Sequence, residues 1–359
     1  MANRKIILCV ADAPGPAEFL APVIPLLKED YDVHVIAVST AKNVLKEMDG
    51  VECNDESQAD GLFRDIKPDL LVFAISSLTG GPYVNNKIVQ LAHDNNIPVI
   101  CLQDIWGNQR WPQNKNVISR IDAVCVPDDF AASLWKEDGF TKDIFVTGSP
   151  AFDRFASVDV GKERVRLRTQ LGIGENERVM LYAGQGTPHH IEQDKKTFAY
   201  VADAIRALSE KMPIALIARY HPRAVETGYY KKYSYGIKIL DTSVFEFADE
   251  ILPAADIVVA MSSTSLLHAC YLRIFGVSVL LPQQGRALLK QIGLDDFPPN
   301  IMGATVGVYD EDPAVFVQTL ERIFTDELLR NDLRKAQEKI FPLDGGSAER
   351  VAKAVIKFL

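Results

Sequence analysis

Four hydroxyl residues follow a short apolar run in the second half of the chain. The run spans residues 257–260, and one residue later come Ser262, Ser263, Thr264 and Ser265, followed by a segment of helical character. Hydroxyl donors, unpaired backbone N–H groups and the positive end of a helix dipole meet in such a turn, which is how proteins bind phosphate or diphosphate. The same residue types also form ordinary helix N-caps. The pattern therefore predicts either an anion-binding turn or a simple cap.

A second candidate loop spans residues 182–190. Gly184 and Gly186 allow a ligand to approach the backbone closely, and Thr187 adds a hydroxyl group. The adjacent His189 and His190 offer a cation or a proton donor near neutral pH. Metal binding is not expected, because neighbouring side chains in a loop rarely face one ion and no cysteine or acidic cluster accompanies them. The alternative is a turn with one solvent-exposed histidine.

Basic residues gather in a third loop. Arg219 and Arg223 are four positions apart and flank His221, which Pro222 biases toward an extended backbone. Two arginines at this spacing are suited to clamp a diphosphate, although an ordinary basic surface turn has the same pattern. We expect the three loops to share one edge of a sheet, and their coincidence predicts a nucleotide-phosphate ligand.

The first half of the chain offers an acidic loop instead. Asp12 and Glu18 follow the first apolar run, where either is suited to act as a general base, to bind sugar hydroxyls, or simply to favour the start of a helix. The segment lacks the Gly-x-Gly-x-x-Gly pattern of dinucleotide-binding loops. NAD is therefore disfavoured, and we expect no cofactor.

A later loop, residues 103–112, combines aromatic and polar side chains. Its residues of interest are Asp104, Trp106, Asn108, Arg110 and Trp111. Aromatic platforms beside amide groups and a carboxylate suit a sugar or a similar polyhydroxylated ligand. We expect Asp104 or Glu18 to be the catalytic base, and Asp12 with the other residues of this loop to contact the sugar or the acceptor. The alternative is a surface loop anchored by its tryptophans.

Apolar runs and amphipathic segments alternate along the chain, which is the βαβ pattern of doubly wound parallel sheets. The strand-like runs of the first half are 5–10, 33–38, 70–75, 98–102, 123–126 and 144–147. Those of the second half are 179–183, 214–218, 237–240, 257–260, 278–281 and 305–308. Helices are expected between them, for example at 18–27, 85–94, 129–137 and 162–171. Two Rossmann-like halves account for this order, and their ligands should bind beyond the carboxyl ends of the strands.

The composition is that of an ordinary globular protein. The chain has 359 residues, a length typical of two domains, with 47% apolar and 24% charged residues. It has no apolar run long enough to span a membrane. The net charge is −9, of which residues 1–156 contribute −8 and residues 157–359 contribute −1. This acidity argues against binding to nucleic acid or to an anionic membrane surface.

Cysteine usage bears on the redox environment. The five cysteines are scattered and no two are close in sequence: Cys9, Cys53, Cys101, Cys125 and Cys270. We expect reduced core residues rather than disulfides or zinc ligands. The N-terminus becomes polar too soon for a signal peptide, and together these features predict a cytoplasmic protein.

Five segments of the chain match a known family in their order. They are residues 16–23, 146–153, the dipeptide His221-Pro222, residues 262–269 and residues 344–351. In these segments the chain resembles the GT-B fold, and within it the branch of hydrolysing UDP-N-acetylglucosamine 2-epimerases and CDP-glycerol glycerophosphotransferase-like proteins. The resemblance implies an α/β fold with two Rossmann-like doubly wound parallel-sheet domains facing across a cleft. It implies an acceptor or sugar domain at 1–155, a nucleotide domain at 156–345 and a final helix, 346–359, that returns to the first domain.

The chain departs from the epimerase pattern at three places. The turn after the first strand lacks the family's arginine, and residues 104–107 stand in the region of its His-x-Glu-Ala-Gly motif. His268 stands where the family has a ribose-binding carboxylate. Because the family's acid/base motif is missing, glycosyl transfer fits these residues better than epimerisation.

The leading hypothesis is a metal-independent glycosyltransferase that uses a nucleotide-diphosphate sugar, with UDP as the expected nucleotide and a hydroxyl group as acceptor. The resemblance implies a role in cell-envelope polysaccharide synthesis. The expected diphosphate contacts are Gly184, Gly186, Thr187, Arg219, His221, Arg223, Ser262, Ser263, Thr264, Ser265 and His268, and His189 or His190 is expected to help neutralise the leaving group. The alternatives are an epimerase or hydrolase of the same nucleotide sugar, and a non-catalytic nucleotide- or sugar-binding protein. A homodimer is an arrangement that the sequence allows.

Overall fold

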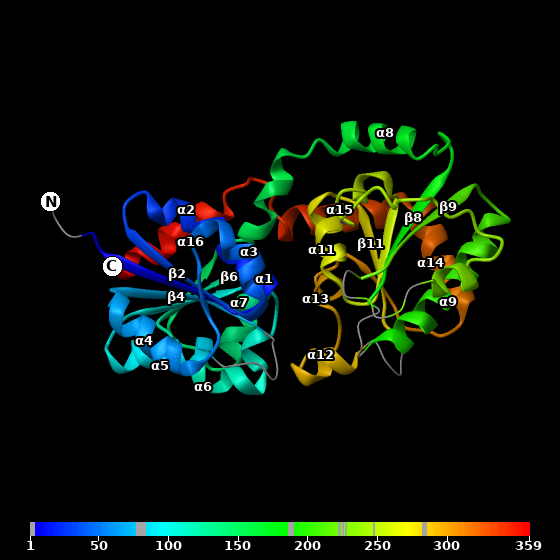
Figure 1. Ribbon diagram of the computed structural model, residues 1–359. Coiled ribbons are helices and arrows are strands. Elements are labelled where there is room, and N and C mark those ends of the chain that lie inside the picture. Colours follow the sequence, from blue (N-terminus) through cyan, green and yellow to red (C-terminus); the bar gives the residue numbers. More distant parts are fainter. Residues whose placement is uncertain are drawn as a thin grey trace. The chain divides into compact units, whose positions relative to one another are not determined.

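The chain divides into two compact units, each built on a parallel sheet (Figure 1). The structure is a computed structural model and describes residues 4–76, 84–185, 190–221, 224, 226, 228–246, 248–281 and 286–359. Unit 1 comprises Met1–Ala156 and Asp344–Leu359, and unit 2 comprises Ser157–Leu343. Within the described ranges, no helix is long and apolar enough to cross a membrane.

Unit 1 has a seven-stranded parallel sheet in the order β3-β2-β1-β4-β5-β6-β7. Its strands are β1 (Ile6–Ala11), β2 (Asp32–Val38), β3 (Val51–Cys53), β4 (Leu70–Ile75), β5 (Val99–Gln103), β6 (Ala123–Val126) and β7 (Asp143–Val146). Its helices are α1 (Pro14–Leu20), α2 (Val23–Lys28), α3 (Lys42–Leu45), α4 (Glu56–Ile66), α5 (Val84–Asp94), α6 (Lys115–Ile118), α7 (Asp129–Glu137) and α16 (Ser347–Val355). Strand order reverses between β1 and β4, and ligands of such sheets bind at this switch point.

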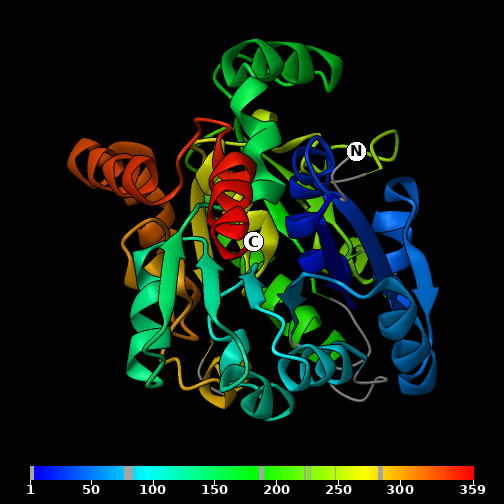
Figure 2. The ribbon, with the colours of Figure 1, turned by 90° about the vertical axis from the view of Figure 1, so that its left-hand side faces the viewer.

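Both faces of this sheet are covered by helices, as a parallel sheet requires. Alternate strand residues such as Ile7, Cys9 and Val72 face one hydrophobic core, which α1, α2 and α16 close. Helices α4 and α5 lie on the opposite face (Figure 1). Figure 2 turns the C-terminal helix α16, in red, toward the viewer.

Two segments far apart in sequence join where α16 begins. The Asp153 carboxylate accepts hydrogen bonds from the backbone N–H groups of Ser347 (3.1 Å) and Ala348 (2.8 Å), in the first turn of α16. The Arg350 side chain donates to the Thr147 carbonyl (2.8 Å). Gly148 has φ +81°, and a Cβ there would lie 2.5 Å from the Ser347 hydroxyl. These contacts join the segments 146–153 and 344–351, which are far apart in sequence, within unit 1.

We expect Asp153→Ala to lower the free energy of unfolding by about 1–2 kcal/mol, because it removes the acceptor for two helix-terminal N–H groups. Urea denaturation followed by circular dichroism measures this change. Asp153→Asn retains one acceptor oxygen and is the matched control, with a smaller loss. Equal stability of the alanine variant and the wild type would contradict the capping role.

Unit 2 has a five-stranded parallel sheet in the order β12-β11-β10-β8-β9. Its strands are β8 (Arg178–Ala183), β9 (Ile214–Arg219), β10 (Ile257–Ala260), β11 (Phe275–Val279) and β12 (Val306–Val308). Its helices are α8 (Val160–Gln170), α9 (Ile191–Ser209), α10 (Tyr229–Tyr233), α11 (Thr264–Tyr271), α12 (Ala287–Gln291), α13 (Pro298–Ile301), α14 (Pro313–Thr325) and α15 (Glu327–Ile340). The switch point of this sheet lies between β8 and β10.

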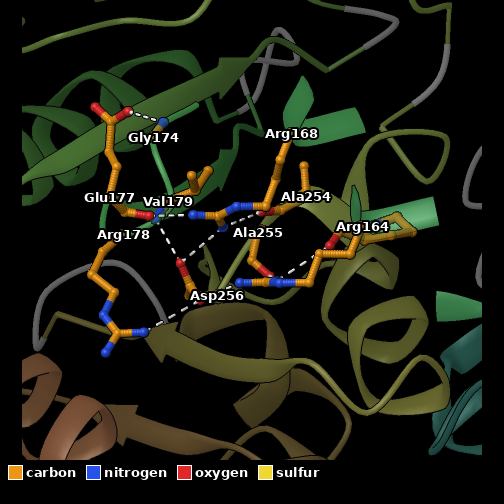
Figure 3. Close-up of polar contacts among 10 residues, drawn as sticks. Arg164, Arg168, Gly174, Glu177, Arg178, Val179, Ala254, Ala255 and Asp256 are labelled. Atoms are coloured by element: carbon orange, nitrogen blue, oxygen red, sulfur yellow. Dashed lines mark hydrogen bonds and ion pairs between the residues drawn. The ribbon is translucent and has the colours of Figure 1, made fainter. Parts of the chain in front are cut away.

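Three arginines converge on Asp256 at the amino-terminal edge of this sheet (Figure 3). Arg164 and Arg168 project from α8, with nitrogen–oxygen distances to the carboxylate of 2.5 and 3.4 Å, and Arg178 lies 3.8 Å away. The same carboxylate accepts the backbone N–H of Val179 (2.8 Å). This cluster attaches α8 to unit 2 at the edge opposite the carboxyl ends of the strands.

The fold class predicted from the sequence is confirmed, since both sheets are parallel and flanked by helices. Three expected elements differ from the structure. The strand expected at 278–281 lies earlier, as β11 (Phe275–Val279). The helix expected at 18–27 is interrupted at Pro22, which lacks an N–H, so that α1 ends at Leu20 and α2 starts at Val23. The strand expected at 237–240 is a single bridge between Leu216 and Ile239. The short strand β3 was not predicted, because two of its three residues are exposed and give no apolar run.

Candidate functional site

Loops from three strands meet at the carboxyl edge of the unit 2 sheet. The Gly184 N–H, just after β8, donates to the carbonyl of Arg219, the last residue of β9 (2.9 Å). The Gln185 side-chain amide donates to the Ser262 carbonyl, which follows β10. The segments predicted to share one edge are therefore together in space, at the switch point between β8 and β10.

A buried carboxylate behind this edge fixes the first of these loops. Asp194, in the first turn of α9, is fully buried and accepts hydrogen bonds from the Gln185 N–H (2.7 Å) and the Tyr182 hydroxyl (2.8 Å). The hydroxyls of Tyr229 and Tyr230 donate to its other oxygen. Burial is the largest cause of the raised pKa values of these three tyrosines, so they stay protonated as donors.

The hydrogen-bonded groups around position 184 leave room only for glycine. A Cβ at this position would overlap the Tyr230 hydroxyl oxygen and would lie 3.0 Å from an Asp194 oxygen and 3.2 Å from the Arg219 carbonyl oxygen. The glycine thus serves close internal packing. Its N–H and that of Gln185 have internal partners, the Arg219 carbonyl and the Asp194 carboxylate.

The hydroxyl run forms the start of α11. Ser263 is its N-cap, and its Oγ accepts the Ser265 N–H (3.2 Å), so the hydroxyl proton remains available to donate. Thr264 is exposed, while Ser262, Ser263 and Ser265 are partly exposed. The helix has eight residues, and its N-terminal N–H groups and dipole favour an anion.

Arg219, one of the predicted phosphate contacts, has internal partners in the structure. Its guanidinium donates to three backbone carbonyls, those of Thr242 (2.8 Å), Phe245 (2.8 Å) and Glu246 (2.7 Å). Burial lowers the pKa of this group from its usual value. The guanidinium therefore holds the segment 242–246.

Of the remaining residues expected to contact the diphosphate, some lie within the described ranges and others lie outside them. His190 immediately precedes α9, His221 follows β9, and His268 lies on α11, each partly buried. Four expected residues lie outside the described ranges: Gly186, Thr187, His189 and Arg223. Among the residues that the structure describes, no group of three or more His, Cys, Asp or Glu side chains is placed to hold a metal ion.

Two carboxyl groups lie at the carboxyl edge of the unit 1 sheet. Asp12 follows β1 and is hydrogen-bonded to the Ser76 hydroxyl, which follows β4. Asp104 follows β5, and one of its oxygens lies 2.6 Å from where a Cβ of Gly15 would be. Burial is the largest cause that raises the pKa of Asp104 to about 7; the nearby Asp12 charge contributes to this rise, and the hydrogen bond from Asn108 opposes it. Burial also raises the pKa of Asp12 to about 6.

An amide network positions Asp104. The Asn108 side chain is buried and donates to Asp104 Oδ1 (2.7 Å) and to the Ile75 carbonyl (3.2 Å). The Asn114 side chain donates to the Ser76 carbonyl (2.8 Å). Asn108, expected to contact a sugar, instead orients the carboxylate and ties it to the end of β4.

Two other members of this loop are also corrections. The Trp106 ring is 4% exposed, and its indole N–H donates to Asp128 Oδ2 (2.8 Å), so it is a core residue and not a sugar platform. Arg110 is paired with Asp138 (2.9 Å) and Glu137 (3.1 Å) on α7 and the turn after it. Trp111 remains partly exposed, and Glu18 is exposed on α1.

The sequence did not point to Asp194. Its only local signal is an acidic residue in the first turn of a helix, which the dipole alone explains. Its tyrosine partners lie 12, 35 and 36 residues away.

Comparison with known proteins agrees with this architecture. No protein-family model matches the chain, and no curated protein matches its sequence. Solved structures match over nearly the whole length. The UDP-GlcNAc 2-epimerase of Neisseria meningitidis bound to UDP-GlcNAc gives a TM-score of 0.66 at 13% identity, covering 98% of this chain and 100% of that chain. The UDP-GlcNAc 2-epimerase of Methanocaldococcus jannaschii gives 0.68 at 15% identity, covering 98% and 99%.

A third matching structure is not named as an epimerase. MurG of Acinetobacter baumannii gives a TM-score of 0.66 at 15% identity, covering 98% of this chain and 99% of that chain. The chain thus has the GT-B-like fold of these structures, which is the fold that the sequence resemblance implied. At these identities the comparison establishes the fold alone.

Proposed function

We propose that this protein is a glycosyltransferase that binds a nucleotide-diphosphate sugar through unit 2. The main observation behind the proposal is that the loops after β8 and β10 meet at the switch point of the unit 2 sheet through Gln185 and Ser262. The hydroxyls of Ser262–Ser265 and the start of α11 are suited to the diphosphate, with His190, His221 and His268 as further donors. The Neisseria structure contains UDP-GlcNAc, so UDP-sugars are the first donors to test.

In this proposal Asp104 of unit 1 is the general base. A pKa of about 7 leaves this carboxylate able to take the proton of an acceptor hydroxyl near neutral pH. The acceptor oxygen then forms its bond to the anomeric carbon as the bond to the diphosphate breaks. The departing nucleoside diphosphate takes the electron pair, and the hydroxyl groups and helix dipole of α11 stabilise its charge.

An epimerase or hydrolase of the same nucleotide sugar is the second candidate. The matching Neisseria and Methanocaldococcus structures are UDP-GlcNAc 2-epimerases, which favours this candidate. The two reactions differ in their need for an acceptor. An epimerase or hydrolase converts or cleaves the donor alone, whereas a transferase releases nucleoside diphosphate at a rate that rises when the correct acceptor is added. Binding without turnover for any donor and acceptor would indicate a non-catalytic binding protein.

Isothermal titration with UDP, CDP, GDP and their sugars tests the binding step. We expect micromolar binding of at least one nucleotide diphosphate, and Ser263→Ala should weaken it by about 3- to 10-fold through loss of one hydroxyl donor. Asp326→Ala is the matched control, because Asp326 caps α15 by accepting the Leu329 N–H (3.1 Å). It should lower stability as much as Ser263→Ala but leave affinity unchanged. No binding of any nucleotide diphosphate by the wild type would refute the proposal.

A further inference from the structure

An arginine at the carboxyl edge of unit 2 has no carboxylate partner among the residues that the structure describes. Arg286 follows β11 and precedes α12. Its guanidinium lies over the ring of Tyr309, 4.4 Å from the ring centroid. Within the described residues Arg286 has no ion pair, and its Nε is buried without a hydrogen-bond partner. Arg286 is only partly buried, so the rest of its guanidinium can meet a ligand, and a cation without an ion pair is stabilised when an anion binds to it.

The ring beneath Arg286 is fixed by its own contacts. Tyr309 follows β12, and its hydroxyl donates to Asp296. The Asp296 carboxylate also accepts the Phe297 N–H (2.7 Å) and the Asn300 side-chain amide (3.0 Å). The nearby acid is therefore engaged with Tyr309 and the start of α13. The stacked ring restrains the guanidinium, whose positive charge has no ion pair within the described part of the chain.

The position of Arg286 relates it to the anion-binding turn. Strands β10 and β11 are neighbours in register, and the Ser278 hydroxyl of β11 donates to the Met261 carbonyl (2.6 Å) immediately before Ser262. Because Arg286 lies over Tyr309, which directly follows β12, it is at the same carboxyl edge of the sheet as the hydroxyl run. Arg219, which the sequence suggested for this role, is engaged with backbone carbonyls.

From this geometry we infer that Arg286, backed by Tyr309, binds an anionic oxygen of the diphosphate of the nucleotide sugar. The inference rests on the proposed function and adds to it a specific cation. A guanidinium presents several N–H groups in one plane, which suits phosphoryl oxygens better than a point charge does. The alternative is that the stacked pair only stabilises the segments after β11 and β12.

Arg330 provides a matched control within the same unit. It too has a buried Nε without a partner among the described residues, and its guanidinium lies 5.6 Å from the ring centroid of Phe275. Phe275 is the first residue of β11, so this pair lies at the amino-terminal edge. The two arginines share their chemistry and differ in the edge at which they lie.

The test measures binding of UDP, uridine and two UDP-sugars to the full-length protein by isothermal titration. Arg286→Gln should weaken UDP binding by about 10- to 100-fold, which is the contribution of a hydrogen bond to a charged group. It should leave weak uridine binding unchanged. Arg330→Gln should leave both affinities unchanged. Arg286→Lys keeps the charge but not the planar donor set, so its affinity for UDP should lie between those of the wild type and Arg286→Gln. If Arg286→Gln does not fold, the affinity of Arg286→Lys decides the question.

The outcomes separate this inference from the proposed function. If the wild type binds no nucleoside diphosphate, the proposed function fails. If the wild type binds UDP and both Arg286 variants bind it equally well, the inference alone fails. Comparison of UDP-glucose with UDP-glucuronate identifies the anion: a loss confined to UDP-glucuronate would assign Arg286 to a sugar carboxylate and overturn the diphosphate assignment.

Discussion

Replacing Asp104 with asparagine is expected to lower the turnover of the nucleotide sugar by about 100- to 10,000-fold, the usual contribution of a positioned general base. The amide has nearly the same shape and can still accept the hydrogen bond from Asn108 (2.7 Å). It cannot take a proton. In the wild type, kcat/KM should rise with pH through about 7 as Asp104 ionises, and the asparagine variant should lose this dependence.

The same substitution should increase the free energy of unfolding, and the size of this increase depends on pH. Burial raises the pKa of Asp104 to about 7 in the folded protein, whereas an unfolded chain has an aspartate pKa of about 3.9. The free energy of unfolding therefore falls as the pH rises from about 4 to about 7, because the unfolded state releases the proton first. Asparagine avoids this loss. We expect Asp104→Asn to gain roughly 1–3 kcal/mol above about pH 8 and almost nothing below about pH 4.

Asp128 supplies the matched control for both measurements. Burial raises the pKa of Asp128 to about 6, but this carboxylate caps α7 and accepts the Trp106 indole N–H. Asp128→Asn should leave turnover unchanged. Steady-state kinetics across pH and thermal unfolding at both pH limits measure the effects. An Asp104→Asn variant with wild-type turnover would remove Asp104 from the mechanism, and Glu18 would be the next candidate.

Gly184→Ala is expected to lower the free energy of unfolding by about 3 kcal/mol, at the upper end of typical overpacking costs. The new methyl group would overlap the Tyr230 hydroxyl and crowd Asp194 and the Arg219 carbonyl. None of these groups moves easily, because the Tyr230 hydroxyl and the Asp194 carboxylate belong to one buried hydrogen-bond network. Nucleotide affinity should also fall, since Gln185 and Ser262 would shift with the loop.

Tyr230→Phe should partly rescue this variant. Alone, Tyr230→Phe should lower the free energy of unfolding by about 1 kcal/mol, because the hydrogen bonds of the hydroxyl to Asp194 (3.1 Å) and to the Arg219 carbonyl (3.3 Å) are lost. Combined with Gly184→Ala, it removes the overlapping oxygen, so the double variant should be more stable than the sum of the single changes predicts, by about 1–2 kcal/mol.

Gly61→Ala is the matched glycine control. Gly61 lies within α4, and an added Cβ there has nothing within 4 Å among the described residues. This change should raise the free energy of unfolding by about 0.5–1 kcal/mol, through helix propensity. Urea denaturation compares all four variants with the wild type. Strict additivity of Gly184→Ala and Tyr230→Phe would show that the hydroxyl is not the source of the strain.

Much of the fold follows from the sequence because its signals are local. Alternation of apolar runs with amphipathic segments determines parallel strands and covering helices, and the exposed β3 was missed because it gives no such run. Candidate loops were also predictable, since every loop after a parallel strand emerges at the same edge. The meeting of the Gln185, Arg219 and Ser262 segments is a consequence of that rule.

The partners of individual side chains were decided only by tertiary structure. Arg219 and Trp106 have residue types that suit ligands, yet their partners, residues 242–246 and Asp128, lie 22 to 27 positions away in sequence. Burial of Asp104 and convergence of three tyrosines on Asp194 likewise depend on which strands become neighbours. Periodicity reports the face on which a residue lies, whereas hydrogen-bond partners and pKa values depend on distances between segments that the pattern does not contain.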